Sequence, residues 1–154
     1  MLTASTIPDR RVLAALPLLP LPNLVLLPGM LLPLNVFEPR YLQLVDHALE
    51  NGRHIGVPLQ RPRHERTSQR LVAIEPVFGI GKLVRHLPLG DGRRLIRLEA
   101  IGRVRLVREL PVDPHLFRRA EVAALPEPSI ADKPSLAALR LQIEQIATRW
   151  GRDG

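Results

Sequence analysis

The sequence contains no cysteine and few aromatic residues. Aromatic side chains make up 3% of its 154 residues. Without cysteine, the chain has no structural disulfides, no thiolate metal sites and no thiol catalysis. A single domain of this length can bury about 70% of its unfolded surface without such cross-links. We therefore expect an aliphatic core in one domain, and the absence of cysteine agrees with a cytoplasmic protein.

Basic residues outnumber acidic residues. The chain has 22 lysines and arginines against 15 aspartates and glutamates, a formal net charge of +7, and only Lys82 and Lys133 are lysines. A basic surface attracts acidic partners, nucleic acid among them. The candidate phosphate ligands follow the Asp91-Gly92 turn: Arg93, Arg94, Arg97, Arg103 and Arg105.

The motifs of several enzyme classes are also missing. A phosphate-binding loop ends in Gly-Lys-Ser/Thr, whereas Gly81-Lys82 is followed by leucine. The five histidines are scattered, and no two of them are four residues apart. Neighbouring histidine and carboxylate residues fall in predicted loops, where a solvated surface is the simpler interpretation. We therefore predict a non-catalytic protein without a metal or another cofactor.

One long uncharged run stands out, from residue 12 to residue 37. Prolines interrupt it five times, at Pro17, Pro20, Pro22, Pro28 and Pro33. Each removes an amide donor and costs about 3 kcal/mol inside a helix, and lipid offers no water to the freed carbonyls. The run therefore predicts neither a membrane span nor a signal peptide. It predicts buried strands near 13–19 and 24–27, a turn at Pro28-Gly29 and a strand at 31–37.

The clearest helical pattern begins at Pro39, since proline suits the first helical position. Asn51-Gly52 is typical of a helix end. Glu38 is not a favoured N-cap, so we expect its carboxylate to have a tertiary partner. The apolar stripe of this helix comprises Tyr41, Leu42, Val45, Ala48 and Leu49.

Further strands are predicted at 55–59, 71–85 and 117–122, with Gly79 and Gly81 allowing a bulge or a close backbone approach. Asp91-Gly92 predicts a hairpin turn flanked by two half-buried runs, 94–100 and 103–110. The fold class is thus mainly β with helices (α+β), a small pseudo-barrel of about six or seven strands with an early inserted helix.

The end of the chain has a different pattern. Residues 126–134 predict a linker, and an amphipathic helix follows from Ser135. This helix docks on its own domain, pairs with a second copy or contacts helices of another chain; the sequence leaves these alternatives open. We divide the chain into a flexible 1–11, a domain at 12–128, and a linker with the C-terminal helix at 129–154. The apolar stripe of that helix comprises Leu136, Leu139, Ile143, Ile146 and Trp150.

The run from Leu16 to Tyr41, LPLLPLPNLVLLPGMLLPLNVFEPRY, resembles the opening motif of the Lon amino-terminal domain family, the substrate-recognition part of Lon proteases. Later segments match in register, including 81–84, 91–93 and 103–105, so the resemblance covers residues 13–128. It implies a PUA-like pseudo-barrel that recognises unfolded or client polypeptides, with a protease as a possible partner. Ala100 departs from the pattern, because the family usually has glycine there.

Two binding hypotheses follow. A small pseudo-barrel cannot easily bury every leucine of the uncharged run, so any left exposed can accept apolar polypeptide segments. The candidates are Leu26, Leu27, Met30 and Leu31, with burial in the core as the alternative. The motif residues Pro28, Gly29, Glu38, Pro39, Arg40 and Tyr41 are expected to be structural. RNA binding is the second hypothesis if the arginines share one face, although partners for base stacking are nearly absent.

Overall fold

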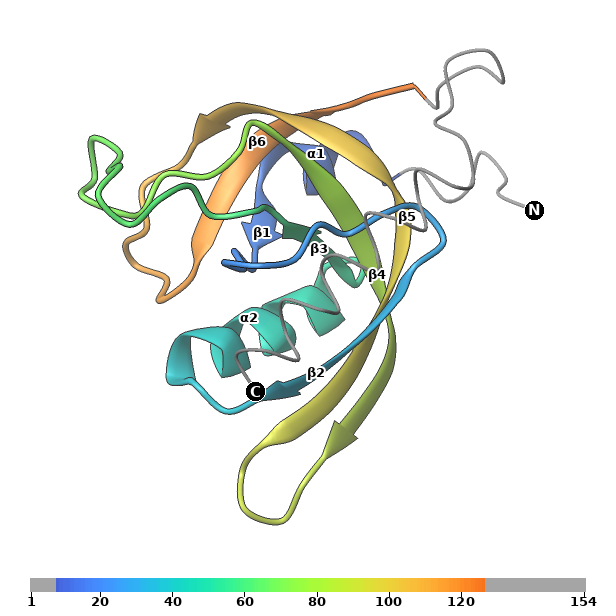
Figure 1. Cartoon of the computed structure of the whole chain (residues 1–154). Coiled ribbons are helices and arrows are strands. Elements are labelled where there is room, and N and C mark those ends of the chain that lie inside the picture. Colours follow the sequence, from blue (N-terminus) through green and yellow to red (C-terminus); the bar gives the residue numbers. More distant parts are fainter. Residues whose placement is uncertain (1–7, 127–154) are drawn as a thin grey trace.

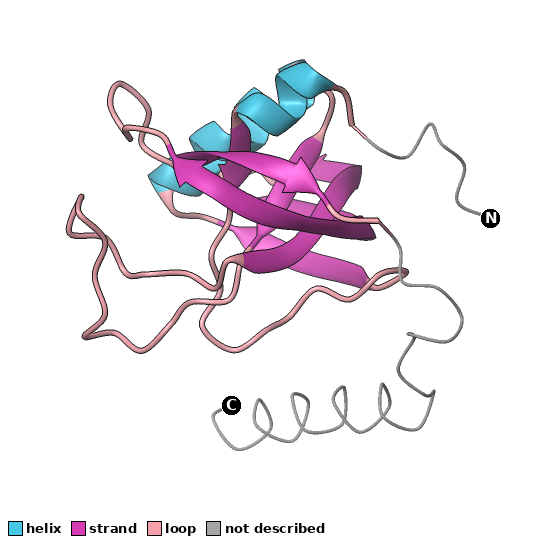
Figure 2. Cartoon of the chain, turned by 90° about the horizontal axis from the view of Figure 1, so that it is seen from above, coloured by secondary structure: helices cyan, strands magenta, loops and turns pink. Residues whose placement is uncertain are grey.

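The computed structural model describes residues 8–126, a mostly-strand chain with few helices, as predicted (Figures 1 and 2). The predicted linker and C-terminal helix lie outside the described residues, apart from Pro126. The elements are α1 (Arg10–Ala14), β1 (Leu16–Leu18), β2 (Leu31–Val36), α2 (Pro39–Glu50), β3 (His54–Val57), β4 (Val77–Pro88), β5 (Arg94–Glu109) and β6 (Arg118–Ala124).

The strands form one six-stranded sheet in the order β2-β5-β4-β3-β1-β6, and β5 also pairs with β6. β5 is long enough to serve two neighbours, since residues 94–99 pair with β2 and residues 104–109 with β6. Consequently β1, β3, β4, β5 and β6 form a closed circuit, which we call the closed half. We call β2, α2 and the hairpin ends of β4 and β5 the helix half (Figure 1).

Each half has its own hydrophobic core. In the helix half, Leu44, Val45 and Ala48 of α2 pack on buried residues of β2, β3, β4 and β5. This is the apolar face that the three- and four-residue spacing predicts. The core of the closed half comprises Leu16, Leu18, Ile74, Phe78, Ile80, Ile101, Val104, Ala120 and Val122.

Residues 24–27 form no strand, contrary to the sequence-based expectation. They cross β4 instead, where Gly79 and Gly81 leave room. A Cβ atom on Gly79 would lie 2.4 Å from the carbonyl oxygen of Leu26. The predicted close backbone approach at these glycines is therefore confirmed, and the leucines reach the core without joining the sheet.

The predicted hairpin turn exists, but its arms were assigned wrongly. Its arms are β4 and β5, and both predicted runs, 94–100 and 103–110, lie on the single strand β5 apart from Leu110. A register shift opposite Ile80 and Gly81 lets β5 continue past Gly102 instead of turning back. The sequence pattern divided this strand into two runs because a bulge interrupts the apolar alternation just as a turn does.

Two other strand predictions were too long. Residues 13–19 hold only the short β1, preceded by the helix α1, whose N-cap Asp9 accepts a hydrogen bond from the amide of Val12 at 3.1 Å. Residues 71–76 contribute isolated bridges before β4 begins. The helix α2, in contrast, begins at Pro39 and ends just before Asn51, as predicted.

Candidate functional site

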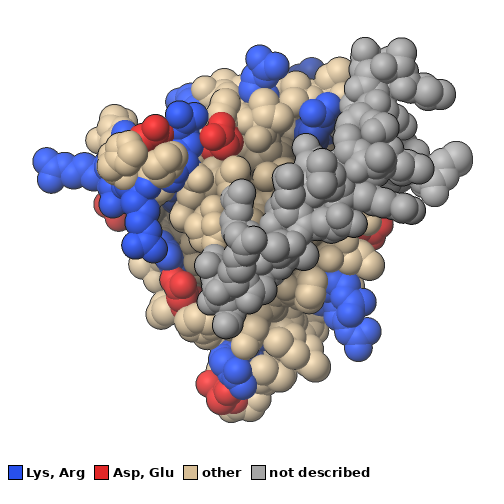
Figure 3. Space-filling model, in the orientation of Figure 1, with Lys and Arg blue, Asp and Glu red and all other residues tan. Residues whose placement is uncertain are grey.

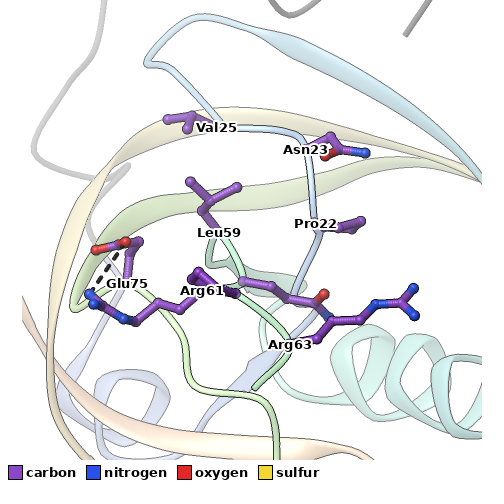
Figure 4. A pocket seen from close by; sticks show the side chains of 9 residues that line it. Pro22, Asn23, Val25, Leu59, Arg61, Arg63 and Glu75 are labelled. Atoms are coloured by element: carbon purple, nitrogen blue, oxygen red, sulfur yellow. Dashed lines mark ion pairs between the residues drawn. The ribbon is translucent and has the colours of Figure 1, made fainter. Parts of the chain in front are cut away.

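A groove of about 480 Å³ lies between the segment that follows β1 and the loop between β3 and β4 (Figure 4). Backbone hydrogen bonds fix its two walls, because the amide of Gln60 donates to the carbonyl of Leu21 at 2.9 Å and the amide of Leu21 to that of Pro58 at 3.0 Å. The lining residues are Pro22, Asn23, Val25, Leu59, Gln60, Arg61, Pro62, Arg63 and Glu75.

The charges at the rim of the groove are largely paired. Arg61 forms an ion pair with Glu65 and a second one with Glu75, at 3.5 Å between Nη1 and Oε1. The hydrogen bond from Arg61 holds the pKa of the Glu65 carboxyl below its usual range. Arg63 extends away from the Arg61–Glu75 pair (Figure 4) and has no ion-pair partner among residues 8–126. The groove therefore offers an apolar lining and one free cation.

The four leucine and methionine candidates lie in different environments. Leu26 is 1% exposed, which makes it a core residue, so its assignment to a binding surface was wrong. Leu27 and Met30 are half-buried, and Leu31 is exposed on β2. Val25 was not among the candidates, and it is exposed between buried Leu24 and Leu26. An all-apolar run carries no alternation that could reveal which side chain faces water.

Pro28 and Gly29 build a tight turn beside the groove. The amide of Met30 donates to the carbonyl of Leu27 at 3.0 Å, and Gly29 has φ +83°. Proline followed by a glycine with positive φ is the pattern of a type II turn. The amide of Gly29 also donates to the carbonyl of Ala100 at 3.0 Å. The turn thereby anchors the start of β2 to β5.

The remaining motif residues surround the start of α2. Arg40 Nε donates to Glu38 Oε2 at 2.9 Å, and the Arg40 guanidinium lies 4.6 Å from the ring centroid of Tyr41. Glu38 therefore pairs locally and not with a tertiary partner, contrary to expectation, because an arginine two residues along is within reach. Pro39 occupies the first turn of the helix. Burial raises the pKa of the Tyr41 hydroxyl.

The five candidate phosphate ligands do not form one cluster. Arg93 pairs with Asp91 at 2.6 Å and Arg94 pairs with Asp46. The other three, Arg97, Arg103 and Arg105, have no ion-pair partner among the described residues. Arg93 directly precedes β5 and the other four lie on it, so at about 3.4 Å per residue the set extends over about 40 Å. The arginines are therefore spread out and partly neutralised, which does not favour the RNA hypothesis.

Residues 8–126 contain neither a membrane-spanning helix nor a metal-binding group of side chains. None of the helices in this range is long and apolar enough to cross a membrane. In the same range, no group of three or more His, Asp or Glu side chains is placed to hold a metal ion.

Residues 15–149 match the family model of the ATP-dependent protease La (LON) substrate-binding domain. The chain belongs to this family. It is 28% identical to the Lon protease of Anaeromyxobacter dehalogenans over 87% of its own length and 16% of that protein. It is 32% identical to Lon protease 2 of Sorangium cellulosum over 77% of its length and 14% of that protein. The chain thus spans about a sixth of these relatives.

Solved structures agree with the family. The crystal structure of a Lon N-terminal domain protein from Xanthomonas campestris superposes with a TM-score of 0.61 at 29% identity, covering 80% of this chain and 66% of that one. The N-terminal domain of the Mycobacterium avium complex Lon protease gives a TM-score of 0.59 at 16% identity, covering 77% of this chain and 58% of that one. The second likeness concerns the fold alone.

Proposed function

We propose that this Lon substrate-binding domain captures unfolded segments of client polypeptides in the groove beside Val25. One observation carries the proposal: a concave, largely apolar groove lies against the uncharged segment that first placed the chain in its family. Concave apolar surfaces with a few polar groups are the usual form of a ligand site. The site and the family together support this function, and the proposal names no particular client.

The lining suits an extended chain in an irregular conformation. Val25 and Leu59 can contact apolar side chains of a bound segment. Pro22 and Pro62 add apolar surface to the groove and have no backbone amide that would need a hydrogen-bond partner. The side-chain amides of Asn23 and Gln60 can donate to and accept from a bound backbone. Such contacts depend little on the client's sequence. The groove therefore fits a domain that recognises unfolded segments generally.

We also infer that the closed half is a PUA-like pseudo-barrel and that the domain works together with a protease. The closed circuit of five strands supports the first inference. The name Lon protease, carried by the matched relatives, supports the second. Self-association through the C-terminal helix and the domain division at 12–128 stay predictions, since they depend on residues 127–154.

The test is fluorescence anisotropy of a labelled, permanently unfolded protein titrated with this chain at about 50 and 300 mM salt, with RNA as a competitor. We expect saturable binding at both salt concentrations, because apolar contacts are only weakly screened. The variant Val25→Asp places a charge in the groove and is expected to weaken binding about tenfold, the effect of roughly 1.4 kcal/mol of lost apolar contact.

Val107→Asp is the matched control, because Val107 is an exposed valine on β5 that does not line the groove. It is expected to bind like the unaltered chain. Equal binding by Val25→Asp would contradict the groove as the site. Binding that disappears at 300 mM salt and is displaced by RNA would contradict the whole proposal and favour the arginine hypothesis.

A further inference from the structure

A second surface lies on the helix half, on the side of the sheet that α2 does not cover. Strand register places nine exposed residues there in three rows, which we call the outer sheet surface. Figure 3 shows charges of both signs around the β3–β4 loop and at the tip of the β4–β5 hairpin, and basic side chains project at the flank of this hairpin. The rows are Asn35, Leu95 and Leu87; Pro33, Arg97 and Arg85; Leu31, Glu99 and Lys82.

The middle row holds an unfavourable contact. Arg85 and Arg97 are directly opposite each other on neighbouring strands, where Cβ atoms lie about 5 Å apart and like charges repel. Neither forms an ion pair with any residue in 8–126, although six other arginines in that range do. The four charged residues of the surface, three cations and one carboxylate, leave a net charge of +2.

The row beside the arginines is apolar. Leu87 is 49% exposed and Leu95 40% exposed, and they are opposite each other just as the arginines are. The leucine row and the arginine row lie two residues apart along each strand, about 6.8 Å. The surface therefore presents an apolar pair and a cationic pair at the repeat distance of an extended polypeptide.

From this arrangement we propose that the outer sheet surface docks an acidic polypeptide segment in which a leucine-like side chain and a carboxylate stand two residues apart. The carboxylate lies between the guanidinium groups of Arg85 and Arg97, which removes their repulsion and adds charge-assisted hydrogen bonds. The apolar side chain covers Leu87 and Leu95. Because the chain can lie in either direction along the strands, either order of the two residues fits.

Two observations favour polypeptide over nucleic acid as the occupant. None of the nine residues is aromatic, so bases have no stacking partner. Glu99 follows Arg97 by two residues and would repel a phosphate backbone running along β5. A single carboxylate placed between the arginines avoids that charge. The surface also differs from the groove proposed above, and no residue is common to the two.

The probe is a short fluorescein-labelled peptide containing Leu-Thr-Glu in a serine and threonine context, titrated with the full chain by anisotropy at about 50 mM salt. We expect the double variant R85Q/R97Q to bind at least about tenfold more weakly, and R85K/R97K to retain most of the affinity. A peptide of the same composition with leucine and glutamate adjacent is expected to bind about fivefold more weakly, because neighbours in an extended chain point to opposite faces.

Arg105→Gln is the matched control, an exposed arginine on β5 without an ion pair among the described residues, and it is expected to bind normally. Val25→Asp is also expected to bind this peptide normally, so the groove and this surface can fail independently. The Tm of R85Q/R97Q should not fall, since the exchange removes a repulsion. Undetectable peptide binding, equal binding by R85Q/R97Q, the same loss in R105Q, or displacement of the peptide by RNA would each overturn the proposal.

Discussion

The two halves of the molecule differ in how completely their strands are paired with neighbouring strands. In the closed half each strand has two neighbours, and a bidentate ion pair between Arg118 and Glu109 links β6 to β5, with both N–O distances at 2.8 Å. In the helix half β2 is an edge strand, and Leu31, Leu87 and Leu95 face solvent. The closed half therefore has no free strand edge, whereas the helix half has one at β2, beside the sheet surface that we propose as a docking site.

β4 is the wall that the two halves share. Phe78 and Ile80 enter the core of the closed half, whereas Leu83 enters the core of the helix half. Between them, Gly79 and Gly81 admit Leu26 against the backbone. The segment that lines the groove is therefore held by the same strand that separates the two cores, and a change at this position affects both.

Gly79→Ala is expected to have the largest effect of the changes considered. The new Cβ would lie 2.4 Å from the Leu26 carbonyl oxygen and 2.8 Å from the Leu26 Cβ. Backbone on both sides of the contact cannot rotate away, so we expect a loss of about 3 kcal/mol in the free energy of unfolding, measured with urea. Gly102→Ala is the control, since no atom lies within 4 Å of its Cβ position. Equal stability of the two variants would contradict the close contact between β4 and Leu26.

Glu109→Gln tests the ion pair of the closed half. The Arg118 and Glu109 side chains are 12% and 11% exposed, and Arg118 also donates to the carbonyl of Val72 at 2.8 Å. Removing the carboxylate charge leaves a largely buried guanidinium without its partner, which costs about 3 kcal/mol for a buried pair and rather less here because the pair is not fully enclosed. Urea unfolding measures the loss. A variant as stable as the unaltered chain would show that the pair contributes nothing to closure.

Asp46→Asn gives the corresponding comparison for the helix half. Asp46 on α2 pairs with Arg94 on β5, but the Asp46 side chain is 57% exposed. A solvated pair contributes about 0.5 kcal/mol, so the loss should be several times smaller than for Glu109→Gln. The two variants are compared by urea unfolding in the same buffer. A loss as large as that of Glu109→Gln would contradict the difference between the halves.

Much of the local structure was predictable because it depends on neighbouring residues. Pro39 and Asn51 delimit α2 through backbone geometry alone, and the Asp91-Gly92 turn needs only the positive φ that Gly92 supplies. The division of β5 between two partners was not predictable in this way. Its bulge near Gly102 depends on the register of β4, which is distant in the sequence, and local alternation cannot tell a bulge from a turn.

The candidate sites were harder to predict than the fold. The uncharged run indicated where a binding surface begins, but Leu26 proved to be core and Val25 exposed, since both are equally apolar. Leu59 and Gln60 join the groove through a bridge to Leu21 that has no local signal. The opposition of Arg85 and Arg97 likewise depends on strand register, so the sequence showed the arginine content and not the pair.

The remaining comparison concerns pH, and its effect is the smallest because the groups are partly solvated. His47 on α2 and His115 in the loop before β6 lie 5.7 Å apart between ring centroids, and both contact Phe117. Burial, followed by the positive charges of His115 and Arg119, holds the pKa of His47 below its usual range, although Glu50 opposes the shift. Burial and Arg119 lower the pKa of His115 in the same direction.

A lowered histidine pKa means that the unfolded chain binds protons more readily than the folded one. Stability should therefore be complete above about pH 6.5, the ordinary histidine pKa, and should decrease as the pH falls below that value. Replacing both residues with glutamine should make the decrease shallower in urea titrations from pH 7.5 to pH 5. Burial also lowers the pKa values of His54 and His86, so some dependence remains. His64→Gln, in the exposed β3–β4 loop, is the control. If the dependence of stability on pH were unchanged in the double variant, His47 and His115 would not contribute to it.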